Sequence, residues 1–183
     1  DPNLGVYGRW FPDGVVNTCY NAVDRHAKTA PERIAIIYDS PVSGSKRSIT
    51  YRELLTEVDA RASVLLEFGV QKGDRVIIYM PMIPETVFAM MACARIGAIH
   101  SVVFGGFAAR ELATRIDDSQ PKVILAGSCG IEPNRLVAYK PMIDEAIEIA
   151  SHKPENVIVF QRKEHPASLV QGRDHDWTSL IGK

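Results

Sequence analysis

The pattern of hydrophobic and polar positions divides the chain into an irregular N-terminal part and a region of regular alternation. Residues 1–16 are rich in glycine, proline and aromatic residues, which predicts an extended segment that Trp10-Phe11 packs onto the body. A helix is expected over residues 17–29, with its N-cap at residue 17 or 18. The N-terminal part therefore begins as an extended lead-in followed by one helix.

A strand, a turn and a second helix are expected next. The β-branched run Arg33–Tyr38 predicts a strand, and the turn-forming residues 39–46 predict that it pairs with Arg47–Ile49 in a hairpin. The segment Thr50–Glu53 has the sequence of a capping box, and apolar residues recur behind it at helical spacing. We therefore expect a capped amphipathic helix that ends at Gly69.

From residue 75 onward the pattern predicts strands that alternate with helices. The expected strands are Arg75–Tyr79, Ala98–Phe104, Val123–Leu125 and Val157–Phe160. The expected helices are Glu85–Ile96, Ala108–Ser119 and Pro141–Ser151. Helices of this length between strands favour right-handed crossovers and a parallel sheet.

Two of these helices differ in their apolar faces. The first, Glu85–Ile96, is apolar nearly all round, which predicts that it lies between two layers. The second carries Leu112 and Ile116 on one face, with Glu111 and Arg115 outside. The last stretch, residues 161–183, is polar and predicts a surface segment without a finished element.

These patterns predict an α/β protein with a mostly parallel sheet and flanking helices. Residues 1–49 are expected to form the lead-in, helix and hairpin, and residues 50–183 a parallel α/β subdomain. A length of 183 residues, 46% hydrophobic, supports one domain with a real core and excludes disorder along the whole chain.

Charge and cysteine content exclude several classes of protein. A net charge of −1 without basic runs argues against partners such as nucleic acid or an anionic membrane surface. No apolar run has the ~18–20 residues that a membrane span needs. The three cysteines are too few and too far apart for a disulfide framework or a zinc site, and their odd number favours an intracellular, reducing compartment. The five histidines show no ligand spacing, so no metal site is predicted.

The candidate ligand-binding residues lie where two predicted strands end. Gly105-Gly106 lies between a strand and a helix, where backbone N–H groups can approach a phosphate-bearing ligand. A tight turn without a ligand would give the same pattern. The segment Glu132, Pro133, Asn134 and Arg135 follows the next strand, so it projects from the same edge of the sheet. The arginine there suits a phosphate, although a solvated loop is an equal alternative.

Two other motifs give weaker evidence of a binding site. Met80–Pro84 also follows a strand at this edge, and its prolines favour a structural turn. Gly44–Lys46 is similar to the end of a P-loop but lacks the upstream glycine and the flanking strand and helix. No arrangement of nucleophile and base is present, so the pattern predicts no catalytic residue in this chain.

Several segments together resemble the N-terminal part of short-chain acyl-CoA synthetases, which are adenylate-forming enzymes. The segments read WF at 10–11, NTCYNAVDRH at 17–26, ITYREL at 49–54, GDRVIIYMPMIP at 73–84, ACARIGAIHSVVFGGF at 92–107 and GIEPNR at 130–135. The resemblance covers essentially the whole chain. The last segment is more similar to the propionate–CoA ligase branch than to the acetate branch, which typically has arginine where Glu132 stands.

The resemblance implies a two-step reaction. ATP and a carboxylate such as propionate or acetate give an acyl-adenylate and pyrophosphate with Mg²⁺, and the CoA thiol then gives the thioester and AMP. It also implies that Gly105, Gly106 and the residues Glu132–Arg135 line the CoA nucleotide site, with Arg135 on a CoA phosphate. Glu132 cannot take the phosphate-binding role of the arginine that it replaces.

The family's phosphate loop, adenine and ribose motifs, acyl pocket and catalytic lysine are expected beyond Lys183. The chain then resembles about the first third of an enzyme, located in the cytoplasm or mitochondrial matrix, and is inactive alone. Exposed apolar surface would favour an oligomer. Two alternatives stay open. A stand-alone module that binds CoA or a nucleotide without catalysis would bind CoA by itself, and a non-binding interaction domain would respond to no ligand.

Overall fold

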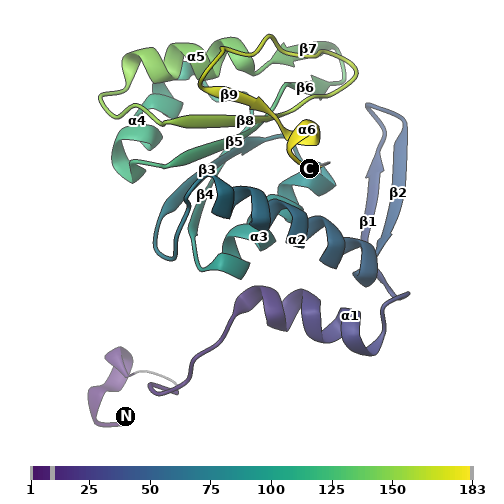
Figure 1. The fold of residues 1–183 in the computed structure, drawn as a ribbon, viewed down its shortest axis with the longest axis vertical. Helices are drawn as coiled ribbons and strands as arrows, with labels where there is room; N and C mark the ends of the chain where they lie inside the picture. Colours follow the sequence, from purple (N-terminus) through teal and green to yellow (C-terminus); the bar gives the residue numbers. More distant parts are fainter. Residues whose placement is uncertain (1, 9–10, 182–183) are drawn as a thin grey trace.

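A five-stranded parallel sheet forms the centre of the molecule. The computed structural model describes residues 2–8 and 11–181 (Figure 1). The strands follow the order β4-β3-β5-β8-β9, and every neighbouring pair is parallel. Their bounds are β3 (Arg75–Met80), β4 (Ile99–Phe104), β5 (Val123–Gly127), β8 (Asn156–Phe160) and β9 (Asp174–Asp176). The predicted α/β class and parallel sheet are confirmed.

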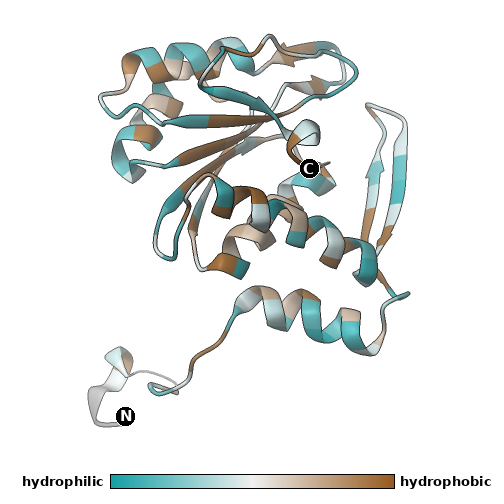
Figure 2. Cartoon of the chain, in the orientation of Figure 1, coloured by the Kyte–Doolittle hydropathy of each residue, from teal (hydrophilic) through white to brown (hydrophobic). Residues whose placement is uncertain are grey.

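Helices cover both faces of this sheet. One face packs against α3 (Pro84–Ile96) and α2 (Tyr51–Glu67), and the other against α4 (Ala109–Ser119) and α5 (Lys140–Ile149). Successive side chains of β3 alternate between the two cores, because strand side chains point to opposite faces in turn. The central strands are accordingly apolar on both faces (Figure 2). α2 also reaches this face, since its Val64 and Leu65 line one small cavity with Leu125 and Ile158 of the sheet, so the position of the apolar helix between two layers stays a prediction.

Local signals explain the bounds of α2. Thr50 accepts a hydrogen bond from the Glu53 amide, and the Glu53 carboxylate accepts one from the Thr50 amide, so the capping box forms. At the other end Gly69 has a φ of 72°, and the amide of Val70 donates to the Leu65 carbonyl over 3.0 Å. This is the glycine-terminated end that the sequence predicts.

The described N-terminal part contains three short helical elements and a hairpin. A 3₁₀ helix, η1 (Pro2–Tyr7), comes first, and a π-helical turn, η2 (Tyr20–Asp24), runs directly into α1 (Arg25–Thr29). The side chain of Asn17 caps this helix, since its oxygen accepts from the Tyr20 amide over 3.0 Å. The hairpin joins β1 (Ile34–Ser40) to β2 (Ser45–Thr50) as predicted, which also excludes a P-loop at Gly44.

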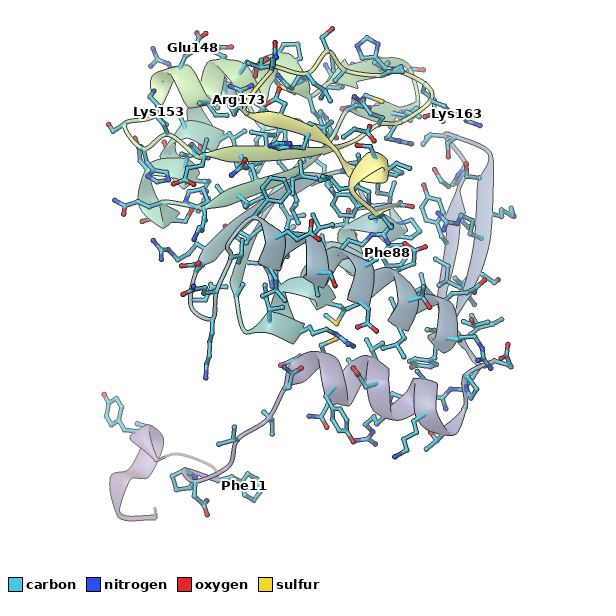
Figure 3. The ribbon with its side chains drawn as sticks, in the orientation of Figure 1. Phe11, Phe88, Glu148, Lys153, Lys163 and Arg173 are labelled. Carbon is cyan, nitrogen blue, oxygen red and sulfur yellow. The ribbon has the colours of Figure 1, made fainter. Side chains whose placement is uncertain are left out.

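The prediction that aromatic residues pack the lead-in onto the body is wrong for Phe11. Its side chain is 82% exposed and lies on the extended segment away from the sheet (Figure 3). Trp10 lies outside the described residues. Phe11 lies in a local turn and has a φ of 49°, in the left-handed region of backbone conformation.

The C-terminal stretch is more ordered than its polarity predicts. β9 adds a fifth strand, and α6 (Trp177–Ile181) packs Trp177 into the core at 3% exposure. The guanidinium of Arg61 lies within cation–π distance of both Trp177 and Phe88, 5.4 Å and 5.6 Å from their ring centroids. The expectation of an unfinished surface segment is therefore wrong for residues 174–181.

Charge pairing explains how such a polar strand enters the sheet. The carboxylate of Asp174, buried on β9, lies 2.8 Å from Lys140 and 2.6 Å from Arg173. Both cations also pair with Asp144 of α5. Two cations and two carboxylates therefore neutralise one another where α5 meets β9.

All three cysteines are free and buried, and Cys93 is the core residue that its apolar helix predicts. Burial raises the pKa of the Cys93 thiol to about 12, so it stays protonated near neutral pH. Within the described ranges, no helix has both the length and the apolar content needed to span a bilayer.

Candidate ligand site at the carboxyl edge of the sheet

The carboxyl ends of β3, β4 and β5 meet at one edge of the sheet. The chain leaves β3 toward α3 on one face and continues from β5 toward α5 on the other, so these neighbouring strands mark the point where the winding reverses. Ligands of open α/β sheets bind at such points. At this point Pro81 packs on Gly127, where an added Cβ would lie 3.0 Å from the proline Cδ. Met80–Pro84 therefore serves as a packed turn.

The two glycines after β4 have different physical roles. Gly105 is buried, and a Cβ there would lie 2.5 Å from the Tyr139 ring, closer than real contacts allow. Gly106 is exposed, has a φ of +102°, and a Cβ there would meet nothing within 4 Å. Only Gly106 therefore presents open backbone to a ligand, while Gly105 is required for packing.

The hydroxyl of Tyr79 holds this turn. It accepts a hydrogen bond from the Gly106 amide over 3.0 Å and donates one to the Phe107 carbonyl over 2.8 Å. Burial raises the pKa of Tyr79, and the hydrogen bond from Gly106 acts in the opposite direction. The phenol is therefore protonated at neutral pH and able to donate.

A second antiparallel hairpin follows β5, where the sequence predicts a loop. It consists of β6 (Cys129–Glu132) and β7 (Arg135–Ala138), joined by Pro133 and Asn134. Its base is fixed to the sheet, because the amide of Arg162 donates to the Ser128 hydroxyl over 2.9 Å and its guanidinium to the Cys129 carbonyl over 3.2 Å. The site predicted at 132–135 is thus the tip of a hairpin arm that is anchored at its base.

Glu132 and Arg135 pair across this tip. The Nε and Nη2 atoms of Arg135 donate to the two carboxylate oxygens of Glu132 over 2.7 and 3.2 Å. Both side chains are exposed. The hydrogen bond from Arg135 lowers the pKa of Glu132, and the same bond raises the pKa of Arg135. The cation proposed for phosphate binding is therefore engaged by a carboxylate in this structure.

Tyr139 connects the turn to the hairpin. Its ring fills the space beside Gly105, and its hydroxyl would lie 2.2 Å from a Cβ on Gly130 of β6. The rings of Tyr139 and Tyr79 lie 5.1 Å apart at 57°. Burial and the neighbouring Tyr79 raise the pKa of Tyr139 to about 12. The structure thus brings the two predicted segments together through a tyrosine pair.

The arrangement suits anion binding. The N-terminal end of α4 and an arginine on the neighbouring arm are groups that bind phosphate, and the open space beside Gly106 lets a ligand approach them. Among the described residues, no group of histidine, cysteine, aspartate and glutamate side chains is placed to hold a metal ion. Sequence reasoning missed Tyr79, Tyr139 and Arg162, for which the only signal was a polar group at the end of an apolar strand.

Comparison with known proteins identifies the family. Residues 23–179 match the family described as "AMP-binding enzyme". This chain belongs to that family. Within it, the chain is 51% identical over 177 residues to a human protein named "Acyl-CoA synthetase short-chain family member 3, mitochondrial". It is 46% identical over 174 residues to a protein of Escherichia coli K12 named "Propionate--CoA ligase".

A solved structure supports the same assignment. The chain superimposes on the structure titled "Acetoacetyl-CoA Synthetase from Streptomyces lividans" with a TM-score of 0.83 at 26% identity. That match covers 96% of this AMP-binding family chain and 26% of the solved one. The human and bacterial relatives are covered to 26% and 28% of their lengths. The chain therefore spans about a quarter of the length of its relatives, close to the third that the sequence predicts.

Proposed function

We propose that this chain is the N-terminal part of a short-chain acyl-CoA synthetase that activates propionate or acetate. The observation that carries the proposal is the identity of 46–51% over 95–96% of the chain to relatives named for this chemistry. In the proposed reaction, the carboxylate attacks the α-phosphate of ATP and releases pyrophosphate. The CoA thiol then attacks the acyl carbon and releases AMP.

We assign to this chain part of the CoA nucleotide site. Gly106 would approach the nucleotide with its backbone, and Arg135 would contact a phosphate after leaving Glu132. Their exposure on neighbouring segments supports this assignment. Gly105 supports the site by admitting Tyr139, and Pro133 and Asn134 shape the tip that presents Arg135.

The ATP and Mg²⁺ sites and the acyl pocket belong, in this proposal, to segments that follow Lys183 in the family. The presence of Glu132 in place of arginine supports propionate over acetate as the carboxylate. An intracellular location, in the cytoplasm or the mitochondrial matrix, is part of the same proposal.

ATP–pyrophosphate exchange tests this function. Exchange would be measured with acetate, propionate and butyrate, on the 183-residue chain and on the full-length protein side by side. We expect exchange by the full-length protein alone, fastest with propionate. Exchange by the 183-residue chain would contradict the assignment of the adenylation residues to later segments. An inactive full-length protein would contradict the proposed reaction, and CoA binding by the short chain without exchange anywhere would favour a binding module.

A further inference from the structure

Tyr79 occupies an unusual position for a core residue. It lies on β3, an interior strand of the sheet, its side chain is fully buried, and it packs in the core shared with α4 and α5. Its hydroxyl reaches the carboxyl edge of the sheet, where it bonds the backbone of Gly106 and Phe107. A buried interior strand is thereby connected directly to the turn that presents open backbone to solvent.

The hydroxyl is not needed to fill space. A phenylalanine would keep the ring and its contacts, so the two hydrogen bonds are what the phenol adds. Without them the Gly106 amide and the Phe107 carbonyl lose their fixed partner, and the turn gains freedom. Glycine can adopt many conformations besides the φ of +102° seen at Gly106, so this turn depends on hydrogen bonds from outside it to keep its conformation.

Tyr139 restrains the other half of the site. Its ring lies against Gly105 on the turn and Gly130 on the β6–β7 hairpin, so its volume fixes the spacing between them. Its own hydroxyl makes no hydrogen bond to the described residues within normal distance limits. The two tyrosines therefore act differently, one through its hydroxyl and the other through its ring.

We propose that Tyr79 and Tyr139 are positioning residues for the CoA nucleotide site, Tyr79 by fixing the turn at Gly106 and Tyr139 by fixing the distance from this turn to Arg135. The inference rests on the proposed function. Neither side chain touches the reacting atoms, so both act on CoA binding and leave carboxylate activation unchanged.

The test uses the full-length protein with Tyr79→Phe, Tyr139→Ala and Tyr20→Phe. Thioester formation gives KM for CoA, and carboxylate-dependent ATP–pyrophosphate exchange reports adenylation without CoA. We expect Tyr79→Phe to raise KM for CoA about fivefold and to leave exchange within about twofold of wild type. Tyr20→Phe, at an exposed tyrosine outside the site, is the matched control for loss of a hydroxyl and should change neither value, whereas Tyr139→Ala should raise KM for CoA.

Each outcome decides the inference. An unchanged KM for CoA in Tyr79→Phe, or an equal increase in Tyr20→Phe, would overturn it. A parallel loss of exchange and thermal stability in Tyr79→Phe would also overturn it, because the tyrosine would then be a general scaffold residue. Failure of the proposed function is distinguishable, since the wild-type protein itself would then form no acyl-CoA.

Discussion

The charge of the hairpin tip is decided by two residues. Arg135 alone would present an exposed cation to the turn at Gly106, but its Nε and Nη2 atoms each donate a hydrogen bond to a carboxylate oxygen of Glu132. A phosphate that approaches Arg135 must displace this carboxylate and lie near its negative charge. Both groups are exposed and screened by solvent, so the competition is modest and sensitive to salt.

Replacing Glu132 by glutamine should therefore improve CoA binding. We expect Glu132→Gln in the full-length protein to lower KM for CoA about twofold to threefold at low salt, with a smaller effect at high salt. Initial rates of thioester formation against CoA concentration measure this. Glu148→Gln removes the same charge from an exposed site on α5 and should have no effect. A raised KM for CoA in Glu132→Gln would show that the carboxylate assists binding.

Some residues of the candidate site could be predicted from the sequence and others could not. Gly106 and Arg135 were predictable because an unusual residue type follows a recognisable strand. Tyr79 was not, because a tyrosine inside an apolar strand has the same pattern whether its hydroxyl is functional or not. The need for glycine at 105 depends on Tyr139, which is 34 positions further along the chain and comes close only in the fold.

At the level of elements, the turn after β4 depends on the hairpin packed beside it. Gly105→Ala places a methyl group 2.5 Å from the Tyr139 ring, so we expect it to lower the free energy of unfolding by about 1–3 kcal/mol. Urea denaturation of the single and double variants measures this. In a Tyr139→Ala background the cost of the same change should largely vanish. Additive costs would contradict a direct clash.

The charge cluster that joins β9 to α5 gives stability that depends on pH. Burial would raise the pKa of Asp174, but hydrogen bonds from Arg173, Lys140 and the Val170 amide outweigh it, and the pKa is lowered. Because the pKa of Asp174 in the folded state is below the unfolded-state value of about 3.9, the ionised carboxylate stabilises the fold fully above that value. This stabilisation is lost as the pH falls through the pKa of the folded state.

Asp174→Asn tests this cluster. Removal of one partner from a buried ion pair costs about 3 kcal/mol, so we expect a deficit of this size in the free energy of unfolding at pH 7. The deficit should shrink below about pH 4, as the wild-type carboxylate becomes protonated. Urea denaturation across this range measures it, with the exposed Asp118→Asn of α4 as a control that shows no deficit. A deficit independent of pH would contradict the account.

The strands and helices that carry a strong hydrophobic period were predicted with small errors at their ends. Thus β3, α3 and α4 differ from their predicted bounds by one residue. The hairpin β6–β7 and strand β9 were missed, because strands of three or four residues are too short to show a hydrophobic period. Their existence depends on partners, β6 on β7 and β9 on the buried cations of the Asp174 cluster.

At the scale of the whole molecule, one of the two edges of the sheet exposes apolar side chains. β4 forms an edge of the sheet, and Val102, Phe104 and Phe107 on and after it are 47%, 64% and 42% exposed. The expectation of exposed apolar surface is thus met on the strand that precedes the candidate site. The division of the chain at residue 50, and an oligomer formed through this surface, stay predictions.

The central claim is that this edge of the sheet binds CoA in a protein that activates carboxylates. Its most direct test is Arg135→Ala in the full-length protein, with Arg25→Ala on α1 as an exposed control. KM for CoA and propionate-dependent ATP–pyrophosphate exchange would be measured on the same preparations. The account predicts an increase of about tenfold in KM for CoA with exchange unchanged. An equal loss in both, or no change in KM for CoA, would contradict it.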